Sequence, residues 1–527
     1  MTDPARCSVC DRQATTGVAL ADSAGYGMIP ANQFGAVMKN NSTVQADDVR
    51  VVVIGAGMSG ILTGIRLLEA GIHNFVIYEK AATLGGTWRE NSYPGLACDV
   101  PSHHYVYSFE PNAEWSQMFS PGPEIRAYFE RTAHKYGVAS HIRYHKEVTA
   151  ARFVDDRWQL SFADGGTDEA QIMIAATGVL HHPVYPQIDG LGSFAGPCFH
   201  SARWDHTVDL TGERVGIIGT GSTAIQIVTG TVDKVAKLDL FQRTAQWVLP
   251  YPNEPYSEEQ KHDFRAHPEK MTELFWHMAE QFNNSFARAV IGDETQMAKI
   301  EQRCRMNLEH NIRDPELRAK LTPDYKVACK RLIMSDSFYS AIQQPHAELV
   351  TAGIKRIEAQ GVRTTDGILH ELDVLVLATG FDGHRFMRDI AISGLDGLDL
   401  NDAWAHSLQA YRCLAVPKFP NFFMLIGPNS PIGNFSLILI AEMQVNYILK
   451  LIERIRRGEC RALAPKPEVS QAFNADIREA MKHTVWVSGC RSWYLDNNGT
   501  PVTWPWSYQR FEDDMREPNL AEFELLA

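Results

Sequence analysis

Two glycine-rich loops are the residues of this chain whose spacing most directly predicts chemistry. Each loop directly follows an apolar run, at residues 51–54 and at residues 215–218. After a buried strand, such a loop makes a tight turn, brings backbone amides close to a pyrophosphate and opens a helix whose N-terminus favours negative charge. The pattern therefore predicts two dinucleotide sites. Their loop residues are Gly55, Ala56, Gly57 and Gly60 at the first site, and Gly219, Thr220, Gly221, Ser222, Thr223 and Ala224 at the second.

The residue that ends the next strand differs between the two sites. Glu79 stands 19 residues past Gly60, where a carboxylate can accept hydrogen bonds from ribose hydroxyls. Arg243, followed by Thr244, stands 22 residues past Gly221, where a guanidinium can bind a 2′-phosphate that an acid would repel. The second site is therefore predicted to take NADPH, with Asp239 inside the strand as the competing reading for NADH.

The stretch from residue 84 to residue 99 distinguishes between FAD and NAD at the first site. It opens with a double glycine and resembles the segment that runs along the isoalloxazine edge in flavoproteins with two dinucleotides. A disulfide reductase is disfavoured, because this stretch holds the solitary Cys98 instead of a redox pair. Asp99 on its own would be a cap or turn residue before Pro101. Next to a flavin, it could instead be a buried carboxylate that sets the electrostatics of a nearby cation, which is the reading we favour.

The elements that position these residues follow from apolar runs and helical spacing. Strands are expected at 49–54, 75–78, 172–178, 238–241, 374–380 and 422–426, and helices at 58–70, 123–136 and 437–457. The fold class is α/β, with two dinucleotide-binding (Rossmann-like) domains, the NADPH domain inserted in the FAD domain, plus a helical subdomain. The expected boundaries are 1–48 for an N-terminal arm, 49–190 and 381–527 for the FAD domain, 191–252 and 326–380 for the NADPH domain, and 253–325 for the helical insertion.

Composition excludes several classes of protein. The chain of 527 residues has a net charge of -13 and no dense basic stripe, which argues against a nucleic-acid partner. No apolar run approaches the roughly 20 residues of a membrane span, and the N-terminus lacks a secretion signal, so a cytoplasmic protein is expected. Nine scattered cysteines suit a reducing compartment in which thiols stay free. The Cys7–Cys10 pair has no further ligands beside it, so no metal site is predicted.

Two longer patterns carry a family resemblance. A linker between the two glycine loops has the pattern F-x-G-x-x-x-H-x-x-x-W-D, and a second pattern, G-G-x-W-x-x-x-x-Y-P-G-x-x-x-D, covers residues 85–99. From about residue 49 to the last tryptophan cluster, the chain resembles the type I Baeyer–Villiger monooxygenases, a class B flavoprotein monooxygenase family. The linker residues that match are Phe194, Gly196, His200, Trp204 and Asp205.

The resemblance implies roles for several residues. Arg331, which follows Lys330, would stabilise the peroxide at the flavin, Asp99 would tune that arginine, and Trp493 would contact NADP. His200 and Trp204 would couple movement of the nucleotide domain to flavin chemistry. Lys330 and Arg331 would also contact NADP, and the expected FAD contacts beyond the first loop and Glu79 are Gly86, Thr87, Trp88, Asp99, Tyr105, Val148 and Leu437.

The resemblance also implies a reaction. NADPH would reduce FAD, O2 would add to give a C4a-peroxyflavin, and its attack on a ketone would yield an ester or lactone, with sulfides as further substrates. The alternative is a flavin monooxygenase of sulfur or nitrogen, which typically lacks the tryptophan found here at Trp204. A non-catalytic NADPH-binding redox sensor is a more distant reading. The partners are then a ketone or sulfide and O2, with the protein a monomer or homodimer.

Overall fold

The structure is a computed structural model that describes residues 49–490, 492–496 and 498–526. The predicted N-terminal arm, with Cys7 and Cys10, lies outside these residues. Within the described part of the chain, no helix is both long enough and apolar enough to cross a membrane.

The first glycine loop belongs to a five-stranded parallel sheet in the order β19-β7-β1-β2-β3. Its central strand β1 (Val51–Ile54) is buried along its length, as expected of a strand covered on both faces. Strand β19 comes from the last third of the chain and pairs in parallel with β7. The prediction that the chain returns to its first sheet is therefore confirmed. The other strands are β2 (Phe75–Tyr78), β3 (Ile142–Arg143), β7 (Ile172–Ala175) and β19 (Phe422–Met424).

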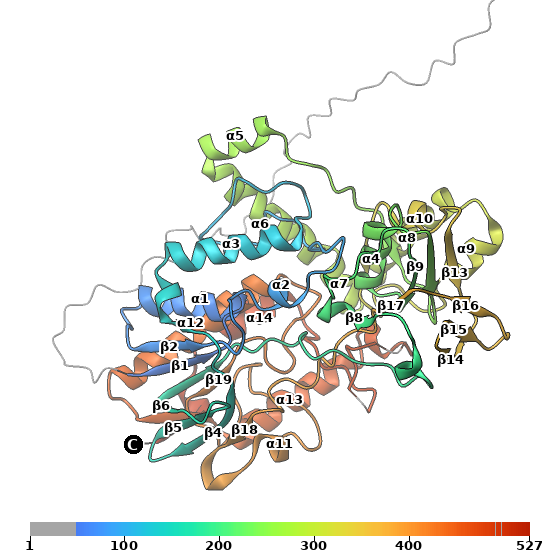
Figure 1. Cartoon of the computed structure of the whole chain (residues 1–527). Helices are drawn as coiled ribbons and strands as arrows, with labels where there is room; N and C mark the ends of the chain where they lie inside the picture. Colours follow the sequence, from blue (N-terminus) through green and yellow to red (C-terminus); the bar gives the residue numbers. More distant parts are fainter. Residues whose placement is uncertain (1–48, 491, 497, 527) are drawn as a thin grey trace, which may run out of the picture. The chain divides into compact units, whose positions relative to one another are not determined.

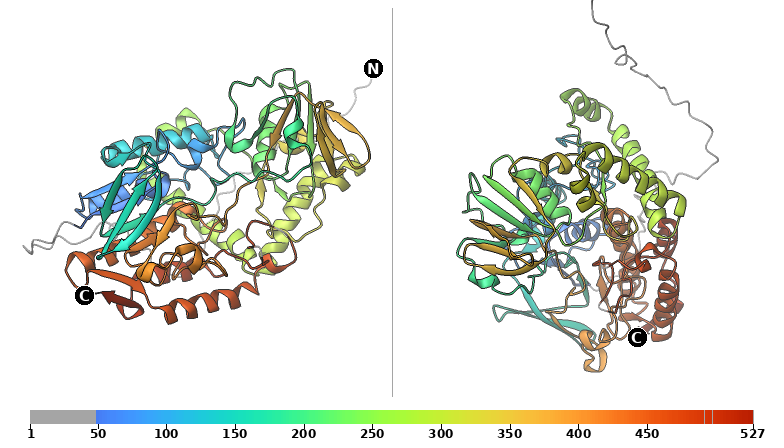
Figure 2. Two further views of the ribbon diagram at one scale, coloured as in Figure 1. Left: turned by 60° about the horizontal axis from the view of Figure 1, so that its bottom comes forward. Right: turned by 90° about the vertical axis from the view of Figure 1, so that its right-hand side faces the viewer.

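The second glycine loop belongs to another five-stranded parallel sheet, in the order β13-β10-β9-β17-β8. The loop connects β9 (Arg214–Ile218) to helix α4 (Ser222–Thr231), as α1 (Met58–Glu69) follows the loop after β1. Figure 1 and the left view of Figure 2 show the two sheets as separate groups of strands. The two dinucleotide-binding sheets that the sequence predicted are both present. The remaining strands are β8 (Cys198–His200), β10 (Lys237–Phe241), β13 (Ala347–Val350) and β17 (Val374–Leu377).

The predicted helical insertion consists of five helices. Side-chain oxygens of Ser257, Asp293 and Asp314 accept hydrogen bonds from first-turn amides and so fix three helix starts. Of two neighbouring aromatic residues in this region, Phe275 is buried in the core, whereas Trp276 is 44% exposed. The helices are α5 (Glu258–Ala266), α6 (Pro268–Asn284), α7 (Phe286–Val290), α8 (Glu294–Asn311) and α9 (Pro315–Leu321).

Two larger sheets with mainly antiparallel pairing were not expected from the sequence. One has the strand order β18-β4-β5-β6, although β18 pairs with β4 in parallel, and the other has the order β14-β15-β16. Their strands are β4 (Val148–Val154), β5 (Arg157–Phe162), β6 (Thr167–Ala170), β18 (Ala391–Ser393), β14 (Ile354–Glu358), β15 (Gly361–Thr364) and β16 (Leu369–Glu371). The other elements are α2 (Thr87–Glu90), α3 (Gly122–Lys135), α10 (Phe338–Ala341), α11 (Leu400–Ala403), α12 (Leu437–Arg456), α13 (Pro467–Met481), α14 (Tyr508–Arg516), β11 (Val248–Leu249), β12 (Ile333–Met334), β20 (Ala462–Pro465) and β21 (Phe523–Leu526).

The expectation that all thiols stay free is wrong for one pair of cysteines. Cys329 and Cys490 form a disulfide between positions that are 161 residues apart in the sequence. Among the described residues, the free cysteines are Cys98, Cys198, Cys304, Cys413 and Cys460.

The backbone around Gly95 passes in direct contact with the backbone of helix α4. A Cβ atom at Gly230 would stand 2.7 Å from the amide nitrogen of Gly95, and one at Gly95 would stand 2.2 Å from the carbonyl oxygen of Gln226. Beside this contact, the Tyr93 hydroxyl donates to Oε1 of Gln226 at 2.9 Å, and Nε2 of Gln226 donates to the carbonyl of Ala97 at 2.9 Å. Both glycines are therefore required by contact between main chains.

We expect Gly230→Ala to lower the melting temperature, because the added methyl group would clash with the backbone at Gly95 and force the two segments apart. An overpacked site of this kind typically costs about 1–3 kcal/mol. The matched control is Gly192→Ala, since no atom lies within 4 Å of a Cβ placed there. Thermal unfolding of the two variants checks the prediction, and equal melting temperatures would contradict it.

Candidate functional site

Both glycine loops open into one cavity of about 1450 Å³. This volume exceeds the range of about 300–1,000 Å³ that is usual for a pocket holding one small molecule. The cavity wall includes Gly55 and Gly57 of the first loop and residues 219–223 of the second. The space and its lining therefore fit two dinucleotides that meet in one site.

The first loop is shaped by contacts that exclude side chains. Gly55 has a φ of 103°, and a Cβ there would stand 2.5 Å from the carbonyl oxygen of Ala176. A Cβ at Gly60 would stand 1.9 Å from the carbonyl oxygen of Gly55, so helix α1 can pack this close only with glycine. Gly60 and Ala56 do not line the cavity, and they hold the loop that does.

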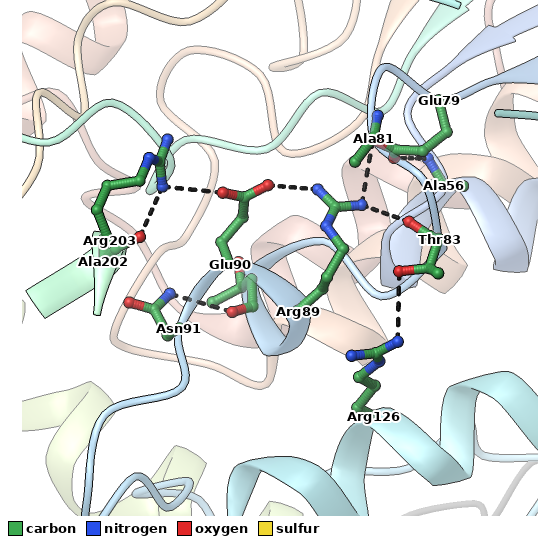
Figure 3. A network of polar contacts seen from close by, with 11 residues as sticks. Ala56, Glu79, Ala81, Thr83, Arg89, Glu90, Asn91, Arg126, Ala202 and Arg203 are labelled. Atoms are coloured by element: carbon green, nitrogen blue, oxygen red, sulfur yellow. Dashed lines mark hydrogen bonds and ion pairs between the residues drawn. The ribbon is translucent and has the colours of Figure 1, made fainter. Parts of the chain in front are cut away.

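The carboxylate of Glu79 lies on the cavity wall at the end of β2, where the sequence predicts a ribose contact. Its two oxygens accept hydrogen bonds from the backbone amides of Ala56 and Ala81, each at 2.9 Å, and Nη1 of Arg89 lies 3.1 Å from Oε1 (Figure 3). The strand end, the glycine loop and helix α2 are thus tied together at this carboxylate.

The polar network continues from Arg89 to the linker between the sheets (Figure 3). Nη2 of Arg89 lies 2.5 Å from Oε1 of Glu90, and Nη1 of Arg203 lies 2.9 Å from Oε2 of the same carboxylate. Burial would raise the pKa of Glu90, but the hydrogen bond from Arg89 and the charges of both arginines outweigh it and lower the pKa. Ser92 makes a second link, because its Oγ lies 2.7 Å from Nε2 of His206.

The double glycine bends the chain so that the next residues face the cavity. Gly85 and Gly86 have φ values of 121° and 52°, which are strained for other residues. Trp88 follows on α2, and its Nε1 donates to the Tyr105 hydroxyl at 3.2 Å. Every predicted FAD contact outside the first loop lines the cavity. Besides Glu79, these residues are Gly86, Thr87, Trp88, Asp99, Tyr105, Val148 and Leu437.

Asp99 and Arg331 form a two-pronged ion pair across 232 residues of sequence. Nε of Arg331 donates to Oδ2 at 2.9 Å, and Nη2 donates to Oδ1 at 2.6 Å. Burial would lower the pKa of Arg331, but the charge of Asp99, followed by Tyr494, outweighs it and raises the pKa, so the guanidinium stays protonated. The Arg331 side chain keeps 34% of its surface accessible and lines the cavity, where it can contact a ligand.

The second loop repeats the geometry of the first. Gly219 has a φ of 122°, and a Cβ there would stand 2.3 Å from the carbonyl oxygen of Ala378. A Cβ at Gly221 would meet nothing within 4 Å, which leaves the main chain open to the cavity. Ala224 does not line the cavity, and it is buried in α4.

Two cationic side chains lie close together on the cavity wall. Arg243 and Lys330 both line the cavity, and Thr244 lies beside them. The pKa of Lys330 is lowered, first by burial and then by the positive charge of Arg243. An anion such as a 2′-phosphate would relieve this repulsion.

Asp239, the competing residue for NADH, cannot serve this site. It is fully buried within β10 and does not line the cavity. Its carboxylate pairs with Nζ of Lys237 at 3.0 Å and with Nδ1 of His370 at 3.3 Å. Glu348 completes a cluster of three possible metal ligands, but the Lys237 ammonium already supplies its positive charge, at 3.1 Å from Glu348.

The linker residues lie outside the cavity wall. His200 accepts a hydrogen bond from the Ala202 amide at Nδ1, at 3.1 Å, and its Nε2 lies 3.1 Å from the Gly380 carbonyl. The Trp204 ring meets Phe199 edge-on, with 5.0 Å between centroids. These contacts fit a role in holding the linker. Phe194 packs on the core beside the second sheet, Gly196 lies against the Asp373 carbonyl, and Asp205 accepts hydrogen bonds from Thr207.

Two polar atoms on the cavity wall have no partner among the described residues. They are Nε2 of His181 and Oγ of Ser492, both buried. A bound dinucleotide, rich in donors and acceptors, can satisfy them, whereas a buried polar atom left unpaired is costly. Ser492 precedes Trp493, which also lines the cavity and was predicted. Sequence reasoning missed His181, although its position just after β7 was a usable signal, because ligands bind at the carboxyl ends of parallel strands.

Two glycine-loop sheets that share one cavity, with an acid at one strand end and an arginine at the other, define a flavoprotein with two dinucleotide sites. Comparisons with known proteins agree with this class. Residues 48–393 match the model of the family described as flavin-binding monooxygenase-like. The chain is 40% identical to a Baeyer–Villiger monooxygenase of Streptomyces coelicolor, over 91% of this chain and 93% of the relative. It is 47% identical to an uncharacterized monooxygenase of Mycobacterium tuberculosis, over 90% of this chain and 96% of the relative.

Solved structures show the same likeness. A closed crystal structure of cyclohexanone monooxygenase has a TM-score of 0.81 and 31% identity, covering 91% of this chain and 99% of that one. An NADP⁺-bound cyclohexanone monooxygenase from Rhodococcus has a TM-score of 0.81 and 30% identity, with the same coverage. The chain belongs to the flavin-binding monooxygenase-like family. It is an enzyme that uses FAD and NADPH, and its relatives place it among the Baeyer–Villiger monooxygenases.

We expect Glu90→Gln to weaken FAD binding and to lower the fraction of NADPH used for oxygenation, because the neutral amide cannot hold Arg89 and Arg203 together. A partly buried ion pair of this kind is worth about 1 kcal/mol, or roughly a fivefold change in affinity. FAD titration of the apoprotein and a peroxide assay measure the two effects. Glu130→Gln is the control, since it breaks the exposed Arg126–Glu130 pair on α3. If both variants behave alike, the network does not connect the two halves of the site.

Proposed function

We propose that this enzyme inserts one oxygen atom beside the carbonyl of a ketone and releases an ester or lactone. The observation that carries the proposal is the Asp99–Arg331 pair, which keeps a protonated guanidinium on the cavity wall. Ketones are the proposed substrate class because cyclohexanone monooxygenases are structural neighbours of the chain. Bound FAD, reduced by NADPH, supplies the activation of O2, and the protein supplies charge, orientation and exclusion of water.

Arg331 is the catalytic residue in this proposal. Its positive charge stabilises the negative charge that develops on oxygen as a nucleophile forms and attacks the carbonyl. Asp99 acts through Arg331, because its two oxygens fix the plane of the guanidinium. Such fixed charges act most strongly where water is excluded. Trp493, which also lines the cavity, would contribute to that exclusion.

The dinucleotides would be held by the residues that the sequence singled out. Backbone amides of the first loop and the Glu79 carboxylate would bind FAD, and residues 219–223 would bind the NADP pyrophosphate. Arg243 and Lys330 would bind the 2′-phosphate, with Thr244 beside them. The linker residues His200 and Trp204 would position the two halves of the site without contacting the reacting atoms.

Sulfide oxidation is proposed as a second activity of the same site, with a flavin monooxygenase specialised for sulfur or nitrogen as the alternative. A ketone and a sulfide supplied together, with mass detection of both products, separate the two. We propose a cytoplasmic enzyme, either a monomer or a homodimer.

We expect Arg331→Ala to keep FAD bound and to oxidise NADPH, yet to lose ester formation by about 100-fold or more, the usual cost of removing one charge-stabilising donor. NADPH electrons should then appear as hydrogen peroxide. Product mass detection with cyclohexanone, together with a peroxide assay, measures both outcomes. Arg318→Ala in the helical insertion is the control, since that side chain does not line the cavity. Unchanged ester formation in Arg331→Ala would contradict the assigned role.

We expect Arg243→Ala to raise KM for NADPH by about tenfold or more and to leave KM for NADH nearly unchanged, because only NADPH carries the 2′-phosphate. A charge-assisted hydrogen bond of this kind contributes about 1.5–3 kcal/mol. Steady-state kinetics with both cofactors provides the measurement, with Arg356→Ala, outside the cavity, as control. Equal losses with NADPH and NADH would show that Arg243 does not read the phosphate.

A further inference from the structure

Two cysteines that the proposed chemistry does not use lie directly beside residues that it does use. Cys329 immediately precedes Lys330 and Arg331, and Cys490 stands three residues before Trp493. The two cysteines form a disulfide, with 6.2 Å between their Cα atoms. A covalent crosslink therefore connects the segment that carries Arg331 to the segment that carries Trp493.

The backbone before Cys329 is held in an unusual conformation. Ala328 has a φ of 66° and is 1% exposed. A non-glycine residue in this region is strained and persists only where its surroundings fix it. The turn lets Cys329 join a buried cluster with Trp486 and Cys490, while Lys330 and Arg331 line the cavity.

The other end of the crosslink also reaches the arginine. The rings of Trp493 and Tyr494 have centroids 4.3 Å apart. A Cβ placed on Gly433 would stand 2.2 Å from the Tyr494 hydroxyl and 3.3 Å from Nη1 of Arg331, so the three residues meet at one point. Movement of Trp493 and Tyr494 would therefore disturb the cavity wall and the packing against Arg331 together.

We propose that the Cys329–Cys490 disulfide is a positioning crosslink for oxygenation, formed and broken according to the redox state of the enzyme. The inference rests on the proposed function, because it assigns the crosslink to the site of that reaction. In the cytoplasm, disulfides of this kind are mostly redox-sensing or catalytic.

Hydrogen peroxide is the oxidant, since a flavin monooxygenase releases it whenever NADPH oxidation is not coupled to oxygenation. One thiol attacks peroxide, which breaks the O–O bond and gives a sulfenic acid and water. The second thiol then displaces the sulfenic oxygen as a second water, and the S–S bond forms. Two thiols are oxidised by two electrons, and one peroxide is reduced to two waters. A dithiol or phosphine reductant reverses the change.

The crosslink should matter most for how NADPH electrons are used. With the disulfide in place, Trp493 and Tyr494 stay fixed, NADP⁺ is retained beside Trp493, and the site stays closed to water. With two thiols, these two residues can move, NADP⁺ leaves sooner, and more electrons end in hydrogen peroxide.

The test uses the FAD-loaded full chain with NADPH, O2 and cyclohexanone. The enzyme is treated with tris(2-carboxyethyl)phosphine or with hydrogen peroxide, and differential alkylation with peptide mass spectrometry then reads the state of Cys329 and Cys490. We expect reduction to free both thiols together and to raise the peroxide released per NADPH about threefold, with FAD content unchanged. Reoxidation should restore the starting value.

Three variants complete the experiment. Cys329→Ala and Cys490→Ala should show the high peroxide release whatever the treatment. Cys304→Ala, which removes a free buried cysteine of the helical insertion, should respond to reductant as the wild type does. If an alanine variant loses FAD, the peroxide released by the wild type after reduction and after reoxidation tests the proposal without that variant.

Two results would overturn the proposal. One is that both thiols alkylate fully before and after peroxide treatment. The other is that reduction breaks the disulfide but leaves peroxide release and NADP⁺ dissociation unchanged. If the enzyme oxygenates no ketone, the proposed function is wrong. The effect of reductant on the rate of NADP⁺ dissociation would still test the role of the disulfide.

Discussion

The Asp99–Arg331 ion pair is the contact on which the geometry of the cavity depends. Its partners stand 232 positions apart, one after the first glycine loop and the other after the helical insertion. A charge that is partly removed from bulk water is stabilised by a close opposite charge, and each of these two groups is the other's compensating partner. The pair is therefore satisfied only when the two dinucleotide halves meet in one arrangement. That requirement makes the ion pair a constraint on structure as well as a source of charge for chemistry.

Residues 85–99 form the segment that meets this constraint, because four of its side chains contact residues between positions 203 and 331. Glu90 reaches Arg203, Ser92 reaches His206, and Tyr93 reaches Gln226. Gly95 passes against α4 with no space for a side chain. A shift of this segment would break several of these contacts at once, so they tie residues 85–99 to the linker and to α4.

The sequence predicted the parts of this site that depend on local order. A strand, a glycine loop, a helix and a charged strand end lie within about thirty residues, and their spacing is set by the covalent chain. The pairing of Asp99 with Arg331 could be reached only through a family resemblance, because spacing carries no information across 232 residues. The antiparallel sheet around β4 was missed because a short alternating strand gives a weak periodic signal. The disulfide was missed because scattered cysteines reveal neither partners nor distance.

The four residues from Ala328 to Arg331 show why such information is absent from local patterns. Each has a different environment. Ala328 lies in a strained buried turn, and Cys329 forms the disulfide. Lys330 lies near the cation of Arg243, and Arg331 pairs with the Asp99 carboxylate. No helical or strand period places consecutive side chains in this way, because both repeat. Such an irregular segment holds its shape only if contacts from outside fix every residue.

The protein carries a net charge of -13, yet it collects Arg243, Lys330 and Arg331 on one cavity wall. The mutual repulsion of these cations is balanced by Asp99 on one side and, in the proposed function, by the phosphate of NADPH on the other. In that proposal, binding of the cofactor would complete the electrostatic balance of the site around the adjacent residues Lys330 and Arg331.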